Sequence, residues 1–162
     1  MSISHLDETV GADEIRGPIL SLDLGAKRVG AAVSDPCLIA ITRLKTLRRS
    51  NWKRLLRDVD DLVRHFDAKT LVIGFPLKLD GGEGSAATET RQIAQKFARS
   101  LELPVYLQDE RLTSREAEER LRARGYRSAE LAALLDSESA AIILSDFIDS
   151  RQQTTRVLRQ LG

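Results

Sequence analysis

The run Leu71–Phe75 constrains the fold more than any other segment of this 162-residue chain. Its residues are Leu, Val, Ile, Gly and Phe, with no polar residue among them, and Pro76 ends the pattern. A strand of this kind is buried on both faces, as in parallel sheets that are covered by helices on each side. The segment therefore predicts an α/β fold with a buried strand at its centre.

Segments with strand or helix patterns surround this run. Further strands are expected at residues 19–24, 29–33, 39–47 and 104–107, and helices at residues 50–65, 85–101, 113–125 and 136–149. The short gaps between the first three strands favour antiparallel hairpins, whereas the later strands alternate with helices and should be parallel. The order β-β-β-α-β-α-β-α-α predicts a mixed five-stranded sheet with helices on both faces.

We expect one folded domain over residues 18–150. Residues 1–17 carry several acids without an apolar stretch and are expected to form a disordered N-terminal tail, and residues 151–162 a C-terminal tail. No apolar run approaches the roughly 20 residues that a membrane span needs, and no signal peptide is recognisable. Cys37, the only cysteine, excludes an intramolecular disulfide and is expected in the core. Together these features predict a cytoplasmic protein.

Three acids stand at the ends of predicted elements. Asp23 interrupts an apolar strand, Glu110 follows the fifth strand, and Asp136 opens the last helix. A buried lone carboxylate costs several kcal/mol unless it is paired or bound to metal, so Asp23 is the hardest of the three to explain structurally. Asp136 could instead be a helix N-cap, and Glu110 could pair with Arg111. Both alternatives remain open from the sequence.

The three acids favour a site for hard divalent cations. The carboxyl ends of parallel strands meet at one edge of a sheet, where ligands usually bind. Mg²⁺ prefers a few carboxylates together with water and phosphate oxygens, and two such ions can promote phosphodiester hydrolysis. We therefore expect Asp23, Glu110 and Asp136 to be catalytic and to bind Mg²⁺ or Mn²⁺ as two ions.

Cations follow the first acid and gather in two further segments, although the net charge is only +1. Gly25, Lys27 and Arg28 follow Asp23 directly, in a turn that could present backbone N–H groups and cations to phosphate. The basic residues of the first segment are Arg43, Lys45, Arg48, Arg49, Lys53, Arg54 and Arg57. Those of the second are Arg111, Arg115, Arg120, Arg122, Arg124 and Arg127. They could be solvated helix faces or local phosphate contacts.

Four motifs resemble the YqgF family, also called RuvX, over residues 18–150. They are Asp23-Leu-Gly-Ala-Lys-Arg-Val-Gly-Ala-Ala-Val-Ser-Asp35, Val72-Ile-Gly-Phe-Pro-Leu-Lys-Leu-Asp-Gly81, Asp109-Glu-Arg-Leu-Thr-Ser114 and Leu135-Asp-Ser-Glu-Ser-Ala-Ala-Ile-Ile-Leu144. Each motif alone is modest, but the four in this order are specific. Lys78 stands where the family usually has asparagine, and Ser139 where it often has alanine.

The resemblance implies a ribonuclease H-like fold in which Asp23, Glu110 and Asp136 match the family's catalytic acids. It implies a metal-dependent nuclease that processes the 5′ end of the 16S ribosomal RNA precursor. For such a nuclease we expect Lys27, Arg28, Lys78 and Arg111 as candidate phosphate contacts. The competing enzyme hypothesis is a Holliday junction resolvase acting on four-way DNA junctions, which would need two active sites and hence a homodimer. A non-catalytic RNA-binding module for ribosome assembly is the third hypothesis. The sequence leaves a monomer and a homodimer both open.

Overall fold

The computed structural model describes residues 15–111, 113–126 and 128–161, and within them a six-stranded mixed sheet. The strands are β1 (Ile19–Leu24), β2 (Arg28–Ser34), β3 (Ile41–Arg43), β4 (Leu47–Arg48), β5 (Thr70–Phe75) and β6 (Val105–Asp109). Their order across the sheet is β3-β2-β1-β5-β6, and β4 pairs with β2. The buried run Leu71–Phe75 is therefore part of an inner strand, β5, as expected.

Strand directions follow the sequence expectation. β1 and β2 are antiparallel, with Asp23 opposite Gly30, and β2 pairs antiparallel with β3 and β4. β5 lies parallel to both β1 and β6. The carboxyl ends of β1, β5 and β6 consequently meet at one edge of the sheet.

The expected third strand, residues 39–47, is two short strands, so the prediction of five strands was wrong by one. The break falls at Leu44–Thr46. Leu44 N still donates to Ala31 O on β2, but its carbonyl accepts a 2.7 Å hydrogen bond from Ser137 Oγ. The strand is thus interrupted where it contacts a helix that is distant in sequence, and no local residue pattern predicts this interruption.

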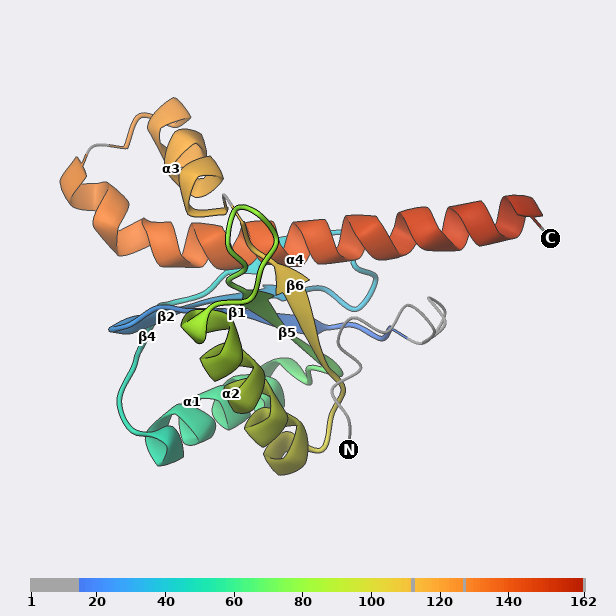
Figure 1. Cartoon of the computed structure of the whole chain (residues 1–162), viewed down its shortest axis with the longest axis horizontal. Coiled ribbons are helices and arrows are strands. Elements are labelled where there is room, and N and C mark those ends of the chain that lie inside the picture. The colour runs from blue at the N-terminus through green and yellow to red at the C-terminus, as the bar shows by residue number, and fades with distance from the viewer. Residues whose placement is uncertain (1–14, 112, 127, 162) are drawn as a thin grey trace.

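Helices cover both faces of the sheet (Figure 1). The helices α1 (Trp52–Phe66) and α2 (Ser85–Leu101) pack on one face, and α4 (Ser128–Leu161) crosses the other with α3 (Thr113–Ala123) against it. The N-cap of α1 is Asn51, whose side chain accepts a hydrogen bond from Arg54 N. Gly125 follows α3 with a φ of +89°, which agrees with the expected end of that helix.

α4 differs most from the expectation. It begins at Ser128 instead of Asp136 and continues to Leu161, through the residues expected as a C-terminal tail. No glycine or proline stands in this span, so nothing in the backbone chemistry interrupts the helix. Asp136 therefore lies inside α4, and its interpretation as an N-cap is wrong. Residues 1–14 of the expected N-terminal tail lie outside the described residues.

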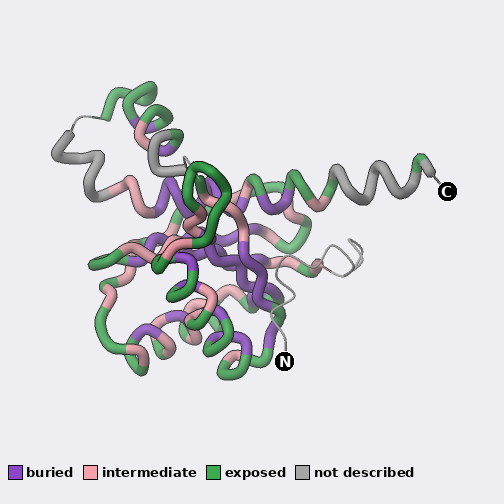
Figure 2. Tube along the Cα trace, in the orientation of Figure 1, coloured by how far each residue is buried: buried purple, intermediate pink, exposed green. Residues whose placement is uncertain are grey.

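Two apolar clusters fill the layers between sheet and helices (Figure 2). One lies under α1 and α2 and includes Leu22, Ile73 and Phe97, and the other lies under α4 and includes Val72 and Phe147. Cys37 is exposed, contrary to the expectation of a core position. In the portion of the chain that the structure describes, no helix combines the length and apolar character needed to span a bilayer.

Candidate active site

Asp23 lies at the carboxyl end of β1, on the face of the sheet that α4 covers. Ser21, two residues earlier on the same face, donates a 2.9 Å hydrogen bond from Oγ to Ala140 O of α4. Because side chains alternate along a strand, Asp23 points to the same side as Ser21. The acid that the sequence marked as anomalous therefore faces the second helical layer.

Gly74 on β5 makes room for Glu110 to reach Asp23. β5 lies between β1 and β6, and Glu110 directly follows β6. A Cβ on Gly74 would lie 2.5 Å from Glu110 Oε2 and 2.6 Å from Ile143 Cδ1, so no larger residue fits without displacement. Across this gap the carboxyl groups of Glu110 and Asp23 are hydrogen-bonded to each other.

The pKa values of both carboxyl groups are raised, and burial is the largest cause in each case. Burial raises the pKa of Glu110 to about 9, with further contributions from the Asp23 charge and hydrogen bond and from Asp109. Burial also raises the pKa of Asp23, and the charge of Asp136 adds to this, while the hydrogen bond from Glu110 opposes it. Two negative charges are therefore unfavourable here unless a proton or a cation stands between them.

Asp136 reaches the same site because α4 approaches β2 at Gly30. A Cβ on Gly30 would overlap the carbonyl of Asp136, so only glycine permits this approach. Gly30 is also the register partner of Asp23. The structure thus brings Asp23, Glu110 and Asp136 into one site, where the charge of Asp136 acts on Asp23.

Arg28 engages the carboxylate of Asp136. Its Nε lies 3.0 Å from Asp136 Oδ2, while half of the Arg28 side chain remains exposed. Among the described residues, Asp136 Oδ2 is nevertheless a buried oxygen without a properly oriented hydrogen bond. The ion pair therefore neutralises this oxygen only in part.

The three acids suit a hard divalent cation by chemistry, but they are not arranged as a closed cage. Within the described ranges, no group of three acid, histidine or cysteine side chains is placed to enclose a metal ion. The crowded Asp23–Glu110 pair and the poorly satisfied oxygen of Asp136 are what a cation would relieve. The donor chemistry of the three acids therefore fits such an ion, whereas their arrangement, with Arg28 on Asp136, does not enclose one.

The turn between β1 and β2 is fixed by its own backbone. Gly25 N donates to Arg28 O at 2.9 Å and lies 3.2 Å from Asp23 O. The amide of Gly25 is therefore occupied within the turn and does not face phosphate as the sequence suggested. Lys27 and Arg28 are exposed beside the acids, so their side chains carry the positive charge of this turn.

Arg49 stabilises the turn between β1 and β2 by hydrogen bonds to its backbone. It donates from Nη1 to Gly25 O and from Nη2 to Glu89 Oε1, each at 2.8 Å, and its backbone N donates to Lys27 O. Its side chain is only 20% exposed. One cation of the first basic segment is thus structural, whereas the sequence had left it open between a solvated helix face and a phosphate contact. Its position next to β4 is the only local signal that could have separated it.

Lys78 and Arg111 lie on the loops that flank Glu110. The backbone of Lys78 closes a turn with Gly81 and Gly82, which leaves its side chain exposed. Arg111 donates to both oxygens of Asp109, from N and from Nε, and from Nη1 to Leu79 O at 3.4 Å. The alternative pairing of Glu110 with Arg111 is therefore wrong, because Arg111 pairs with Asp109.

Comparison with known sequences places the chain in a single protein family. A family model named RuvX and described as Holliday junction resolvase matches residues 17–150. A proposed pre-16S rRNA nuclease of Anaeromyxobacter sp. (strain Fw109-5) is 39% identical, covering 82% of this chain and 96% of its own. A protein of the same name from Gloeothece citriformis is 40% identical, covering 82% of this chain and 88% of its own.

Solved structures share the fold at much lower identity. Thermus thermophilus RuvC in complex with a Holliday junction substrate gives a TM-score of 0.54 at 16% identity, covering 84% of this chain and 96% of that one. The fowlpox virus resolvase with its Holliday junction DNA gives 0.51 at 15% identity, covering 82% and 97%. These likenesses support the ribonuclease H-like arrangement expected from the sequence.

Proposed function

Since this chain belongs to the RuvX family, we propose that it is a cytoplasmic, divalent-cation-dependent nuclease that processes the 5′ end of the 16S ribosomal RNA precursor. The substrate follows the names of relatives that are matched over most of their own length. The observation that carries the catalytic part is the half-buried Asp23–Glu110 pair, whose raised pKa values support a site for positive charge.

Asp23, Glu110 and Asp136 would hold the cations, Mg²⁺ or Mn²⁺. Bound cations would supply an activated water and would stabilise the leaving oxygen in phosphodiester hydrolysis. Gly30 and Gly74 keep the acids together by admitting α4 on one side and Glu110 on the other. The protein's own contribution is therefore to hold together three carboxylates that would repel one another without a bound cation.

Arg28 would change partner when substrate arrives. Its guanidinium lies on Asp136, and the Arg28 side chain is 52% exposed, so a substrate phosphate can reach it from solvent. Arginine binds phosphate oxygens as readily as carboxylate oxygens. Substrate binding would then release Asp136 to complete the carboxylate set, with Lys27, Lys78 and Arg111 as further phosphate contacts.

The test uses wild-type protein and the Asp23→Asn variant on precursor 16S ribosomal RNA, with Mg²⁺, Mn²⁺ or EDTA. We expect wild type to cut the RNA with either metal, and neither EDTA-treated wild type nor Asp23→Asn to cut it. Equal cutting by wild type and the variant would contradict the metal-site assignment. Equal RNA binding by both without any cutting would favour a non-catalytic assembly module.

Cleavage of four-way DNA junctions is the second candidate activity, and the family description favours it. Symmetric cutting of two strands needs two active sites, and hence a dimer. The same proteins are therefore incubated with a four-way DNA junction, and their mass is measured by light scattering with and without the junction. A monomer that stays monomeric on junction DNA and leaves it uncut would exclude this candidate.

A further inference from the structure

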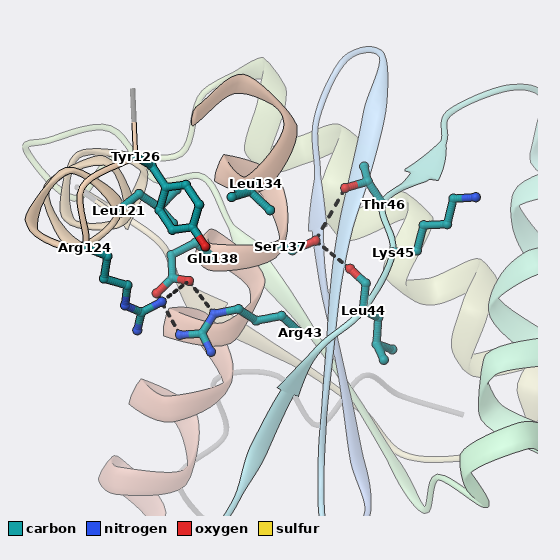
Figure 3. Close-up of a pocket in the computed structure, with 10 residues that line it drawn as sticks. All are labelled: Arg43, Leu44, Lys45, Thr46, Leu121, Arg124, Tyr126, Leu134, Ser137 and Glu138. Atoms are coloured by element: carbon teal, nitrogen blue, oxygen red, sulfur yellow. Dashed lines mark hydrogen bonds and ion pairs between the residues drawn. The ribbon is translucent and has the colours of Figure 1, made fainter. Parts of the chain in front are cut away.

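A pocket of about 480 Å³ lies beside the candidate active site, on the other side of α4. Figure 3 shows its walls, which are the strand segment from Arg43 to Thr46, the end of α3 and one side of α4 around Glu138. The size falls in the range of small-molecule sites. Nothing in the proposed cleavage chemistry uses this pocket.

The floor of the pocket is a buried carboxylate that holds two arginines. The Glu138 side chain is fully buried, and Arg43 donates to both of its oxygens, from Nε and Nη2. Arg124, which directly follows α3, places its Nη1 3.4 Å from Glu138 Oε2. Burial opposes the ionisation of Glu138, but the hydrogen bonds and charges of these arginines outweigh it and lower the pKa of the carboxyl.

The pocket keeps an excess of positive charge after this pairing. One carboxylate faces two guanidinium groups, and Lys45, whose amine points away from them in Figure 3, adds a third positive charge at the edge of the pocket. The Arg43 and Arg124 side chains are 38% and 50% exposed, so both still face solvent. Because Glu138 fixes their planar groups in place, they are prearranged for an anion such as phosphate.

An exposed aromatic ring forms part of the pocket wall. Tyr126 is 40% exposed, and its backbone is held by a hydrogen bond from its N to Leu121 O after the turn at Gly125. Leu121 and Leu134 line the pocket near the ring (Figure 3). An aromatic face beside apolar walls and fixed cations suits a group that joins a flat ring to a phosphate.

The pocket is tied to the candidate active site through α4. Asp136 and Glu138 are two residues apart, which turns their side chains about 200° around the helix, so that they face opposite sides. Ser137, between them, donates to Leu44 O and fixes the strand wall of the pocket. A nucleic acid strand that crosses the N-terminal half of α4 therefore meets both places.

We propose that this pocket binds one nucleotide of the substrate strand next to the cleaved bond, with the base on Tyr126, its phosphate on Arg43 and Arg124, and Lys45 at the edge of the pocket toward the neighbouring phosphate. The assignment to a strand rests on the proposed nuclease function. A free mononucleotide offers the same chemistry, and the experiment distinguishes the two sources.

The experiment measures binding in EDTA, so that it does not depend on cleavage. Tyr126→Ala and Lys45→Ala are compared with Tyr126→Phe and with Lys53→Ala, an exposed cation on α1 away from the pocket. The probe is a 12-nucleotide single-stranded RNA that carries 2-aminopurine at one position at a time, and anisotropy gives the affinity. Adenosine monophosphate is titrated separately by calorimetry. Arg43 is left intact, because its loss would strand the buried Glu138 carboxylate.

We expect Tyr126→Ala to weaken RNA binding about 5- to 30-fold and to abolish the quenching of 2-aminopurine at one position, while Tyr126→Phe retains both. Lys45→Ala should make the slope of log K against log salt less steep by about 0.7, and Lys53→Ala should not. Wild-type affinity and quenching in Tyr126→Ala would overturn the proposal, as would adenosine monophosphate binding as tightly as the strand.

Failure of the proposed function gives a different result. If wild type does not cut precursor RNA but binds the probe through Tyr126, the nuclease assignment fails and the pocket assignment stands. If wild type cuts and Asp23→Asn does not, while Tyr126→Ala binds like wild type, only the pocket assignment fails.

Discussion

Replacing Glu110 with glutamine tests the crowding of carboxylates directly. The pKa of Glu110 is about 9 in the folded protein, against 4.5 for an ordinary glutamate, so folding takes up a proton between these pH values. A raised carboxyl pKa stabilises the fold at low pH, and this contribution is lost as pH rises from 4.5 to 9. At pH 7 the loss spans two and a half pH units, or about 3 kcal/mol at about 1.4 kcal/mol per unit.

Glutamine removes this loss, because it is neutral at every pH. Its amide can donate toward Asp23 as the protonated carboxyl does. In EDTA we therefore expect Glu110→Gln to be more stable than wild type by about 3 kcal/mol at pH 7 and by less than about 1 kcal/mol at pH 5. The gain at pH 7 corresponds to a rise in Tm of about 6–12 °C for a chain of this size.

Urea and thermal unfolding followed by circular dichroism, at pH 5 and pH 7, measure both quantities. The matched control is Glu118→Gln, an exposed residue paired with Arg122 on the same helix, which should change stability by less than about 0.5 kcal/mol at either pH. Adding Mg²⁺ should stabilise wild type at pH 7 more than Glu110→Gln, because the ion would bind the ionised pair of the folded state. A variant that gains nothing at pH 7, or gains equally at both pH values, would refute the reasoning.

Three further substitutions test how the site is held together. Gly30→Ala should cost at least about 2 kcal/mol in urea unfolding, because its Cβ overlaps the carbonyl of Asp136; wild-type stability would contradict that approach of α4. Arg49→Lys should slow single-turnover RNA cleavage about 10-fold or more, with a change in unfolding free energy below about 1.5 kcal/mol. The reason is that lysine cannot reproduce both contacts of the guanidinium, to Gly25 O and to Glu89. An unchanged cleavage rate would show that the turn does not depend on these contacts. Arg28→Gln should tighten Mn²⁺ binding to the free protein in calorimetry and weaken RNA binding, and the opposite changes would contradict the exchange of Arg28 between Asp136 and phosphate.

The sheet could be predicted from the sequence because each of its main strands has a recognisable local residue pattern. Apolar runs, short hairpin gaps and the alternation with helices gave the strand positions and directions to within a few residues. Asp23 was also recognisable, since a carboxylate in an apolar strand has few structural explanations. These features depend on neighbours in the chain, and a single sequence contains them.

The parts that the sequence missed depend on contacts between distant residues. The third strand breaks because Ser137, 93 residues further on, binds Leu44 O. From the sequence alone, Glu138 does not differ from the other acids of its helix. Its role depends on Arg43, 95 residues away, which pairs with it only in the folded protein. Asp136 resembled an N-cap because acids are common there, and only the observed start of α4 at Ser128 removed that interpretation.

Two glycines explain why the site and the pocket exist together. Gly74 admits Glu110 to Asp23, and Gly30 lets α4 approach the sheet at Asp136. The approach at Gly30 fixes the depth and rotation of α4, so it also decides which way the next residues of that helix face. Glu138 then points away from the carboxylates, where its charge assembles the two arginines and does not repel Asp23. A helix placed farther from the sheet would weaken the acid cluster and the basic pocket at once, so a substitution at Gly30 should impair strand binding as well as cleavage.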